Sequence, residues 1–304
     1  MMKYKIVLVV GIFSTLNVAG QTPSDAVYMG KNSICFMGAF GQSSWEKYWE
    51  NTLKRENLNI GTNTTSTILF MSAIGITDKL NAFVALPYIS TENSAGNLLG
   101  QKGIQDLSIA FKYKLLEQNG IRIIGSLGGS VPIGNYIPDF LPMSIGLQSP
   151  SLTGRLIVNY RHASGLYLTA QGGYTGRGNI KIDRDSYQAY DIVYDTKTVA
   201  IPNLADGGIH LGYLKHGLQV YSFIERFDCI GGDNIRRNDM PFPSNDMSGT
   251  NLGGFIKYQP KNIGINFRYG YTIKGHNVGQ AASWMTGILY QFKYKRDKEV
   301  NPVQ

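Results

Sequence analysis

The sequence has few of the features that mark helical membrane proteins or disulfide-rich secreted proteins. After the first twenty of its 304 residues, no apolar run approaches the roughly 20 residues that a spanning helix needs, and the mean hydropathy is -0.14. Two cysteines, Cys35 and Cys229, are too few for a disulfide scaffold, although a single bridge between them stays open. Long basic blocks are lacking, so the formal charge of +8 does not indicate nucleic-acid binding. A helical membrane protein is therefore excluded.

The N-terminus has the layout of a secretory signal peptide. Lys3 and Lys5 form a basic start, residues 6–18 form an apolar core, and residues 18–20 are small enough for cleavage. Loss of residues 1–20 lowers the formal charge from +8 to about +6, because the two lysines leave with them. The exported chain is then either a soluble protein or a transmembrane barrel, whose alternating strands carry little net hydrophobicity.

Apolar and polar residues alternate along most of the chain, which is the pattern of half-buried strands. The alternation is clearest in residues 106–115, 152–161 and 263–273. Weaker alternation defines nine further segments, which are 34–41, 58–74, 80–89, 121–131, 166–177, 205–214, 218–226, 251–258 and 283–294. Together these segments predict twelve strands within residues 33–294.

The connections between the segments alternate in length. Short, turn-rich joints occupy residues 77–79, 117–120, 162–165, 215–217 and 259–262. Longer polar stretches occupy residues 42–57, 90–103, 132–150, 178–204, 227–250 and 274–282. Outer-membrane barrels alternate short periplasmic turns with long external loops in this way. The expected fold is all-β, an antiparallel up-and-down transmembrane barrel of about twelve strands, with residues 21–32 as a periplasmic or plug segment and residues 295–304 as a periplasmic tail.

Aromatic residues on the apolar faces provide a second indication of a membrane barrel. Those beside short turns or the C-terminus are Tyr113, Tyr160, Tyr213, Tyr258 and Tyr294, and those near the long loops are Tyr88, Tyr174, Tyr271 and Trp284. Ten residues separate Trp284 from Tyr294, and at about 3.4 Å per residue and a tilt near 40° they span roughly 26 Å. We therefore expect two girdles at the membrane interfaces, contact with outer-membrane lipid and lipopolysaccharide, and insertion by the outer-membrane assembly machinery.

The faces opposite the apolar ones are expected to line the lumen. Their ionisable residues, seven basic, three acidic and one histidine, are Asp106, Lys112, Lys114, Arg122, Arg155, Arg161, Asp206, His210, Glu225, Lys257 and Arg268. Such charges are costly on the lipid side, so they predict a hydrated lumen with a positive bias that favours anions. The same faces carry the large apolar residues Phe83, Ile124, Tyr167, Tyr221, Phe223, Phe255 and Met285, which either accept an apolar solute or pack against a plug.

The first long loop allows two structures. Ser43 and Glu46 are spaced as a capping box, and Trp45, Tyr48, Trp49 and Leu53 have helical spacing. The loop is therefore either a short amphipathic helix or an extension of the flanking strands.

Three stretches within residues 75–134 match a known family. They are residues 75–81 (GITDKLN) running to 86–88 (LPY), residues 103–108 (GIQDLS) running to 112–113 (KY), and residues 131–134 (VPIG). In these stretches the chain resembles the outer-membrane barrels of the MetA-pathway of phenol degradation, which are distantly similar to FadL-type transporters of hydrophobic solutes. The resemblance implies transport of small molecules, including aromatic ones, and it assigns no substrate residues.

Enzymatic chemistry has little support in the sequence. His210 faces inward near Asp206 and is the best candidate for acid-base chemistry, but neither H-E-x-x-H nor G-x-S-x-G occurs. The loop 178–204 lacks the spacing of a calcium-binding loop, and a solvated surface explains its four aspartates, Asp183, Asp185, Asp191 and Asp195. We therefore expect no enzyme activity, no cofactor and no metal.

The sequence predicts an outer-membrane channel for passive uptake of small molecules, hydrophobic or aromatic ones included. Two alternatives stay open. One is a closed barrel with a structural or assembly role, which binds a partner through its long loops or its periplasmic tail. The other is a barrel hydrolase that depends on His210.

Overall fold

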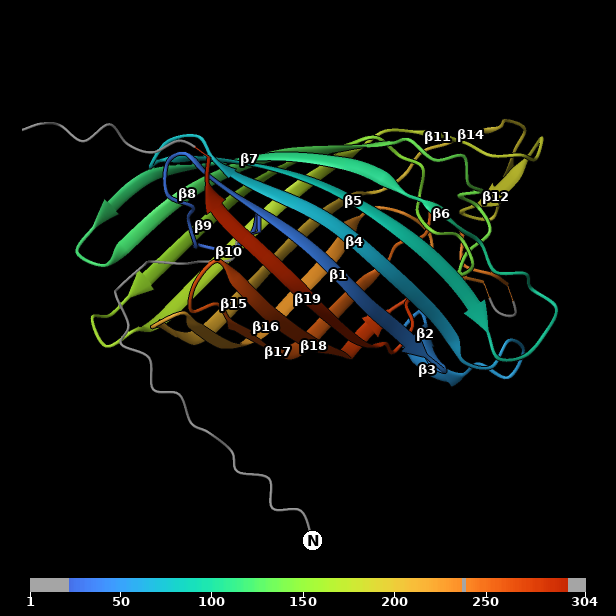
Figure 1. Cartoon of the computed structure of the whole chain (residues 1–304). Helices are drawn as coiled ribbons and strands as arrows, with labels where there is room; N and C mark the ends of the chain where they lie inside the picture. The colour runs from blue at the N-terminus through green and yellow to red at the C-terminus, as the bar shows by residue number, and fades with distance from the viewer. Residues whose placement is uncertain (1–21, 237–238, 295–304) are drawn as a thin grey trace, which may run out of the picture.

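A computed structural model describes residues 22–236 and 239–294, and in it the chain forms a β-barrel (Figure 1). The signal peptide and the C-terminal tail predicted from the sequence lie outside these residues. The barrel strands are β1 (Ser33–Trp45), β4 (Asn63–Gly75), β5 (Leu80–Asn93), β7 (Asp106–Gln118), β8 (Ile121–Pro132), β9 (Ser151–Arg161), β10 (Leu166–Arg177), β15 (Asn203–Lys215), β16 (Leu218–Ile230), β17 (Ser248–Tyr258), β18 (Ile263–His276) and β19 (Ala282–Lys293).

Each barrel strand pairs with its neighbours in antiparallel register, and the first strand closes the barrel. β1 pairs with β4 on one side and with β19 on the other, so that Met37 lies between Met71 and Leu289. The twelve strands predicted from the sequence are therefore confirmed as a closed antiparallel barrel. Closure pairs the two edge strands that an open sheet would leave with free backbone groups. In lipid these groups have no water to bond to, so they must be paired within the protein.

The strand ends differ from the prediction mainly at the long-loop end. β1, β5 and β16 each continue four residues further than the alternation indicates, whereas residues 58–62 precede β4 instead of belonging to it. In the extended part the inter-strand ladder continues through small polar residues, for example between Ser44 and Thr64. Sequence periodicity marks only the part of a strand that has one apolar face, so it does not detect these extensions.

Two of the short turns have a backbone that favours tight reversal. Asn119 and Gly120 both have positive φ, at 50° and 81°, and so do His216 and Gly217, at 54° and 77°. Two central residues with positive φ are typical of the two-residue hairpin turns that match the twist of the flanking strands. These turns gather at one end of the barrel, and the strands of the long loops gather at the other (Figure 1).

The side chains that point outward are apolar, and those that point inward are mixed. Leu211 on the outer surface is 63% exposed, whereas the inward-facing Phe83 is 2% exposed. Seven of the nine predicted girdle residues are exposed, and Tyr213 and Trp284 are partly buried. A bulge between Lys114 and Leu116 interrupts the alternation of β7 close to the turn. An exposed apolar band of this extent fits a lipid environment.

The first long loop is a hairpin, which excludes the helical alternative. It consists of β2 (Lys47–Glu50) and β3 (Leu53–Glu56). The amide of Trp49 donates to the carbonyl of Val278 at 2.9 Å, and the indole side chain of Trp49 is buried. Backbone hydrogen bonds to the loop after β18 thus hold the segment extended, and the alternative of strands that continue above the barrel describes it better.

Two of the remaining long loops, 90–103 and 178–204, contain short strands. These are β6 (Lys102–Ile104), β11 (Ile180–Lys181), β12 (Tyr187–Ala189), β13 (Ile192–Tyr194) and β14 (Thr198–Val199). Loop 178–204 is packed around a buried apolar cluster, which consists of Ile180, Ile182, Val199 and Ile201. Asp185 pairs with Lys197 and Asp191 with Arg236.

The structure also bears on membrane-spanning helices, metal ligands and the two cysteines. Within residues 22–236 and 239–294, no helix has the length and apolarity to cross a bilayer. Over the same ranges, no three His, Cys, Asp or Glu side chains gather as metal ligands would. Cys35 and Cys229 are both free thiols, so the disulfide that the sequence left open is not formed.

Candidate functional site: the barrel lumen

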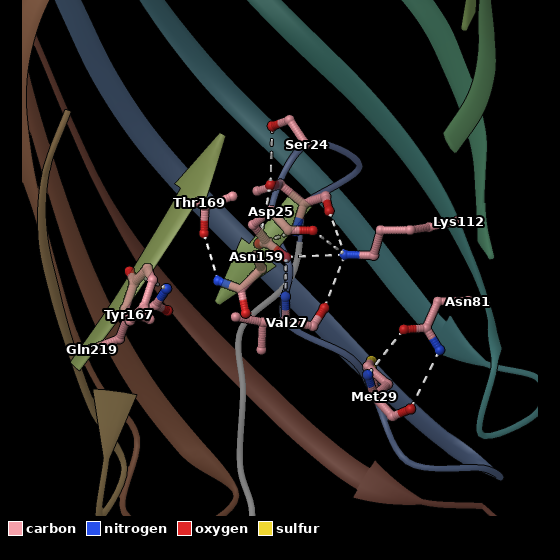
Figure 2. A network of polar contacts seen from close by, with 11 residues as sticks. Ser24, Asp25, Val27, Met29, Asn81, Lys112, Asn159, Tyr167, Thr169 and Gln219 are labelled. Atoms are coloured by element: carbon pink, nitrogen blue, oxygen red, sulfur yellow. Dashed lines mark hydrogen bonds and ion pairs between the residues drawn. The ribbon is translucent and has the colours of Figure 1, made fainter. Parts of the chain in front are cut away.

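The residues before β1 lie inside the barrel and are held there by one lysine. The ammonium of Lys112, on β7, donates to the carbonyls of Thr22, Asp25 and Val27 at 2.9, 3.0 and 2.9 Å, and to Asp25 Oδ1 at 3.0 Å (Figure 2). The Lys112 side chain is fully buried. A buried ammonium needs several acceptors to offset its lost hydration, and this segment provides four.

Two other parts of the wall fix the same segment. The amide of Met29 donates to Asn81 Oδ1 at 3.0 Å, and Asn81 Nδ2 donates back to the carbonyl of Met29 at 3.3 Å (Figure 2). Ala26 packs in a buried cluster with Ile124 and Ile157. We call residues 22–32 the N-terminal segment; it occupies the lumen near the short-turn end.

Charged residues near the short turns make contacts of their own. Glu117 accepts hydrogen bonds from both Lys114 and Arg122, and Arg161 Nη2 donates to the carbonyl of Leu214 at 2.7 Å. These predicted lumen residues therefore lie at the mouth of the barrel, apart from its centre.

The centre of the lumen holds a network of ion pairs. Arg155 binds the Asp206 carboxylate through its two terminal nitrogens, Nη1 at 2.7 Å and Nη2 at 2.9 Å. Glu225 accepts from His210 Nε2 at 3.0 Å and from Arg268 Nη2 at 2.6 Å. The partner of His210 is thus Glu225, whereas Asp206 was the neighbour predicted from the sequence. The register of β15 and β16 sets His210 opposite Phe223, which leaves Glu225 as its diagonal neighbour. Asp206 is instead bound by Arg155 on β9.

Aromatic rings cover the same part of the wall. Tyr221 stacks on His210 with 4.9 Å between ring centroids, and on Phe255 with 4.8 Å. The guanidinium of Arg268 lies 3.8 Å from the ring centroid of Phe223, a cation-π contact. Tyr167 lies further toward the short turns and accepts a hydrogen bond from Gln219.

The ion-paired side chains, together with Tyr221 and Phe255, border a cavity of about 440 Å³ in the lumen. One wall is polar and contains two sets of ion-paired side chains, Arg155 with Asp206, and Glu225 with His210 and Arg268. The facing wall, on β1, β4 and β19, is apolar and consists of Met37, Leu69, Met71, Met285 and Leu289. Thr22, Ser24 and Asp25 of the N-terminal segment also border it, so the segment forms part of the cavity wall.

Most of the apolar wall was not predicted from the sequence. Met37, Leu69 and Met71 were not among the candidates, and neither was Asn266, which also lines the cavity. The signal that finds the first three is weak, because small residues and serines around Cys35, Met37 and Leu69 blur the period of two. Only the pairing of β1 with both β4 and β19 shows that these side chains meet.

Asp106, another candidate, lies at the long-loop end and does not line the cavity. The hydroxyl of Tyr136 donates to Asp106 Oδ1 at 2.6 Å and accepts from the amide of Gln148 at 2.9 Å. Burial, together with the Asp106 carboxylate, raises the pKa of the Tyr136 phenol, so it stays protonated as a donor. These contacts tie loop 133–150 to the barrel rim.

A closed twelve-stranded barrel with an apolar exterior and a mixed lumen defines an outer-membrane β-barrel. The family model described as "Putative MetA-pathway of phenol degradation" matches residues 51–286, and the chain belongs to this family. The resemblance noted in residues 75–134 is thereby confirmed.

One solved channel shares the fold at low sequence identity, and other barrels are more distantly similar. The COG4313 outer membrane channel from Pseudomonas putida F1 superposes with a TM-score of 0.71 at 12% identity, over 90% of this chain and 100% of that one. The TodX monoaromatic hydrocarbon channel (deltaS2 mutant) gives a TM-score of 0.45 at 12% identity, over 88% and 91%. The NanC porin gives 0.46 at 8% identity, over 83% and 98%. No curated protein sequence matches the chain.

Proposed function

We propose that this protein is a passive outer-membrane channel for small solutes that have an apolar or aromatic part. The observation that carries the proposal is the lumen cavity, which has a volume of about 440 Å³ and both a polar and an apolar wall. Cavities of this size are typical of small-molecule sites. The apolar wall contains Met37, Met71 and Met285, and methionine adapts its shape to different apolar and aromatic partners.

The polar wall also favours passage over tight capture of a metal or catalysis. The charges of Arg155, Asp206, Glu225 and Arg268 are satisfied within the wall, so an uncharged solute displaces no ion pair when it enters. His210 is bonded to Glu225 and stacked on Tyr221, which supports a role in the lining. The Pseudomonas putida F1 structure of the same fold is named a channel, which agrees with this proposal.

Passage requires the N-terminal segment to shift, because it occupies the lumen between the cavity and the short-turn end. Its contacts with Lys112 and Asn81 are hydrogen bonds and one ion pair, and water replaces these contacts when the segment leaves its place. The solute then leaves toward the side of the short turns, which is the periplasmic side in barrels of this kind.

The test compares two neighbouring tryptophan substitutions. Met71→Trp places a large ring in the cavity, whereas Phe70→Trp changes the lipid-facing side of the same strand. Uptake of labelled benzyl alcohol at low external concentration is measured in Gram-negative cells with and without the protein. We expect uptake to depend on the protein, to fall to background with Met71→Trp, and to persist with Phe70→Trp.

A failure would point to the structural alternative. If cells with and without the protein take up benzyl alcohol equally, while the protein migrates as a heat-modifiable barrel in outer-membrane fractions, the channel proposal is wrong. The closed barrel that binds a partner would then be the better description.

A further inference from the structure

Two lysines are almost completely buried in the lumen, and they differ in their partners. Lys112 has four hydrogen-bond acceptors within 3.0 Å. Lys257, on β17, is 1% exposed, and its ammonium has no hydrogen-bond or ion-pair partner among the described residues. A buried ammonium without acceptors is costly, so this position requires an explanation.

Lys257 is also the unpaired cation of the cavity. The other cations on the described cavity wall are Arg155, Arg226 and Arg268, and each forms an ion pair within the barrel. Asp25 borders the cavity too, but its carboxylate is engaged by Lys112. The wall therefore has one positive charge that no carboxylate offsets at contact distance.

Amide side chains flank this lysine on both neighbouring strands. Gln219 on β16 and Asn266 on β18 stand directly opposite Lys257 in register, and both line the cavity. Amide groups donate hydrogen bonds as well as accept them. The lysine stem has four carbons joined by rotatable bonds and already borders the cavity, so a change of rotamer brings the ammonium between the two amides.

An aromatic surface lies at a fixed distance from the same lysine. Phe255 is two residues before Lys257 on the same face of β17, which places the two Cα atoms about 7 Å apart. Phe255 stacks on Tyr221, and the apolar side chains of Met37 and Leu289 lie on the cavity wall as well. A ring that contacts Phe255 and Tyr221 can therefore carry a substituent that reaches Lys257.

We propose that the cavity binds small aromatic anions of the aryl carboxylate class. The carboxylate contacts the Lys257 ammonium between Gln219 and Asn266, and the ring lies against Tyr221 and Phe255. This assignment rests on the proposed channel function and specifies its solute class. The anion offsets the unpaired charge of Lys257, while the ring leaves water for the aromatic and methionine surfaces.

The test uses the purified full chain in detergent and two ligands of nearly the same size. Benzoate carries the charge and benzamide does not. Binding is measured by calorimetry for the unchanged protein, Lys257→Met, Lys257→Arg and Lys181→Met, the last being an exposed loop lysine. We expect benzoate to bind about tenfold or more weakly to Lys257→Met, because a charge-assisted hydrogen bond is lost. Lys257→Arg and Lys181→Met keep benzoate affinity within about threefold, and benzamide binds all four proteins alike.

The outcomes separate this inference from the channel proposal. If Lys257→Met binds benzoate as the unchanged protein does, or if the unchanged protein does not prefer benzoate to benzamide, the anion site is wrong. If Lys257→Met does not fold, failure of the folded Lys257→Arg protein to retain benzoate binding has the same meaning. Cellular uptake of benzyl alcohol that depends on the protein would still support the channel in each of these cases, whereas its absence would refute the channel itself.

Discussion

Replacement of Lys112 by methionine should release the N-terminal segment from the lumen. Methionine keeps most of the volume of the side chain but removes the charge and all four hydrogen bonds to Thr22, Asp25 and Val27. The Asp25 carboxylate then keeps its hydrogen bonds from Thr22 and Val27 but loses the cation that offsets its charge, and three carbonyl oxygens lose the lysine as a donor. Movement of the segment into water restores solvation to these groups.

The size of the effect follows from the burial of the pair. Removal of one partner of a buried ion pair costs about 3–5 kcal/mol, because the other charge stays uncompensated. Such a change shifts the balance between a seated and a displaced segment by roughly two to three and a half orders of magnitude. Two other anchors remain, the paired hydrogen bonds of Asn81 with Met29, at about 1 kcal/mol per bond, and the packing of Ala26 against Ile124 and Ile157, and neither offsets the uncompensated charge of Asp25.

Single-channel recording in planar bilayers measures the consequence. We expect Lys112→Met to raise the open fraction or the conductance strongly, and Lys181→Met, an exposed loop substitution, to leave both unchanged. Faster proteolysis of residues 22–32 should accompany the change. Equal conductance and equal proteolysis for Lys112→Met and the unchanged protein, both as heat-modifiable barrels, would refute the view that this lysine holds the segment in place.

Two further substitutions test the turns and the rim. Gly120→Ala introduces a Cβ 2.6 Å from a carbonyl oxygen at a residue with φ of 81°, so we expect a loss of about 1–3 kcal/mol in urea unfolding from lipid vesicles. Gly154→Ala, which meets no atom within 4 Å, is the control and should change stability by less than about 0.5 kcal/mol. Tyr136→Phe removes the hydrogen bond to Asp106 and should speed amide hydrogen exchange in loop 133–150, with about 1–2 kcal/mol less protection. Unchanged exchange there would show that the phenol does not hold the loop.

Much of the barrel was readable from the sequence because its cause is local. Each strand must turn one face to lipid and the other to the lumen, and this requirement imposes a period of two on residues such as those of 263–273. Turn residues mark the strand ends by their own backbone preferences, as Asn119 and Gly120 do. Local reasoning left a helix and an extended structure open for residues 43–53, and hydrogen bonds to residues 278–280 decide for a hairpin.

The sequence by itself thus determined the strand number, the two faces of each strand and the polar character of the lumen, because each depends on alternation within one segment. Only the tertiary structure decided which inward residues meet. The partner of His210, the position of the N-terminal segment on Lys112 and the isolation of Lys257 all depend on strand register and barrel closure. These contacts join residues far apart in the chain, and no local pattern records them.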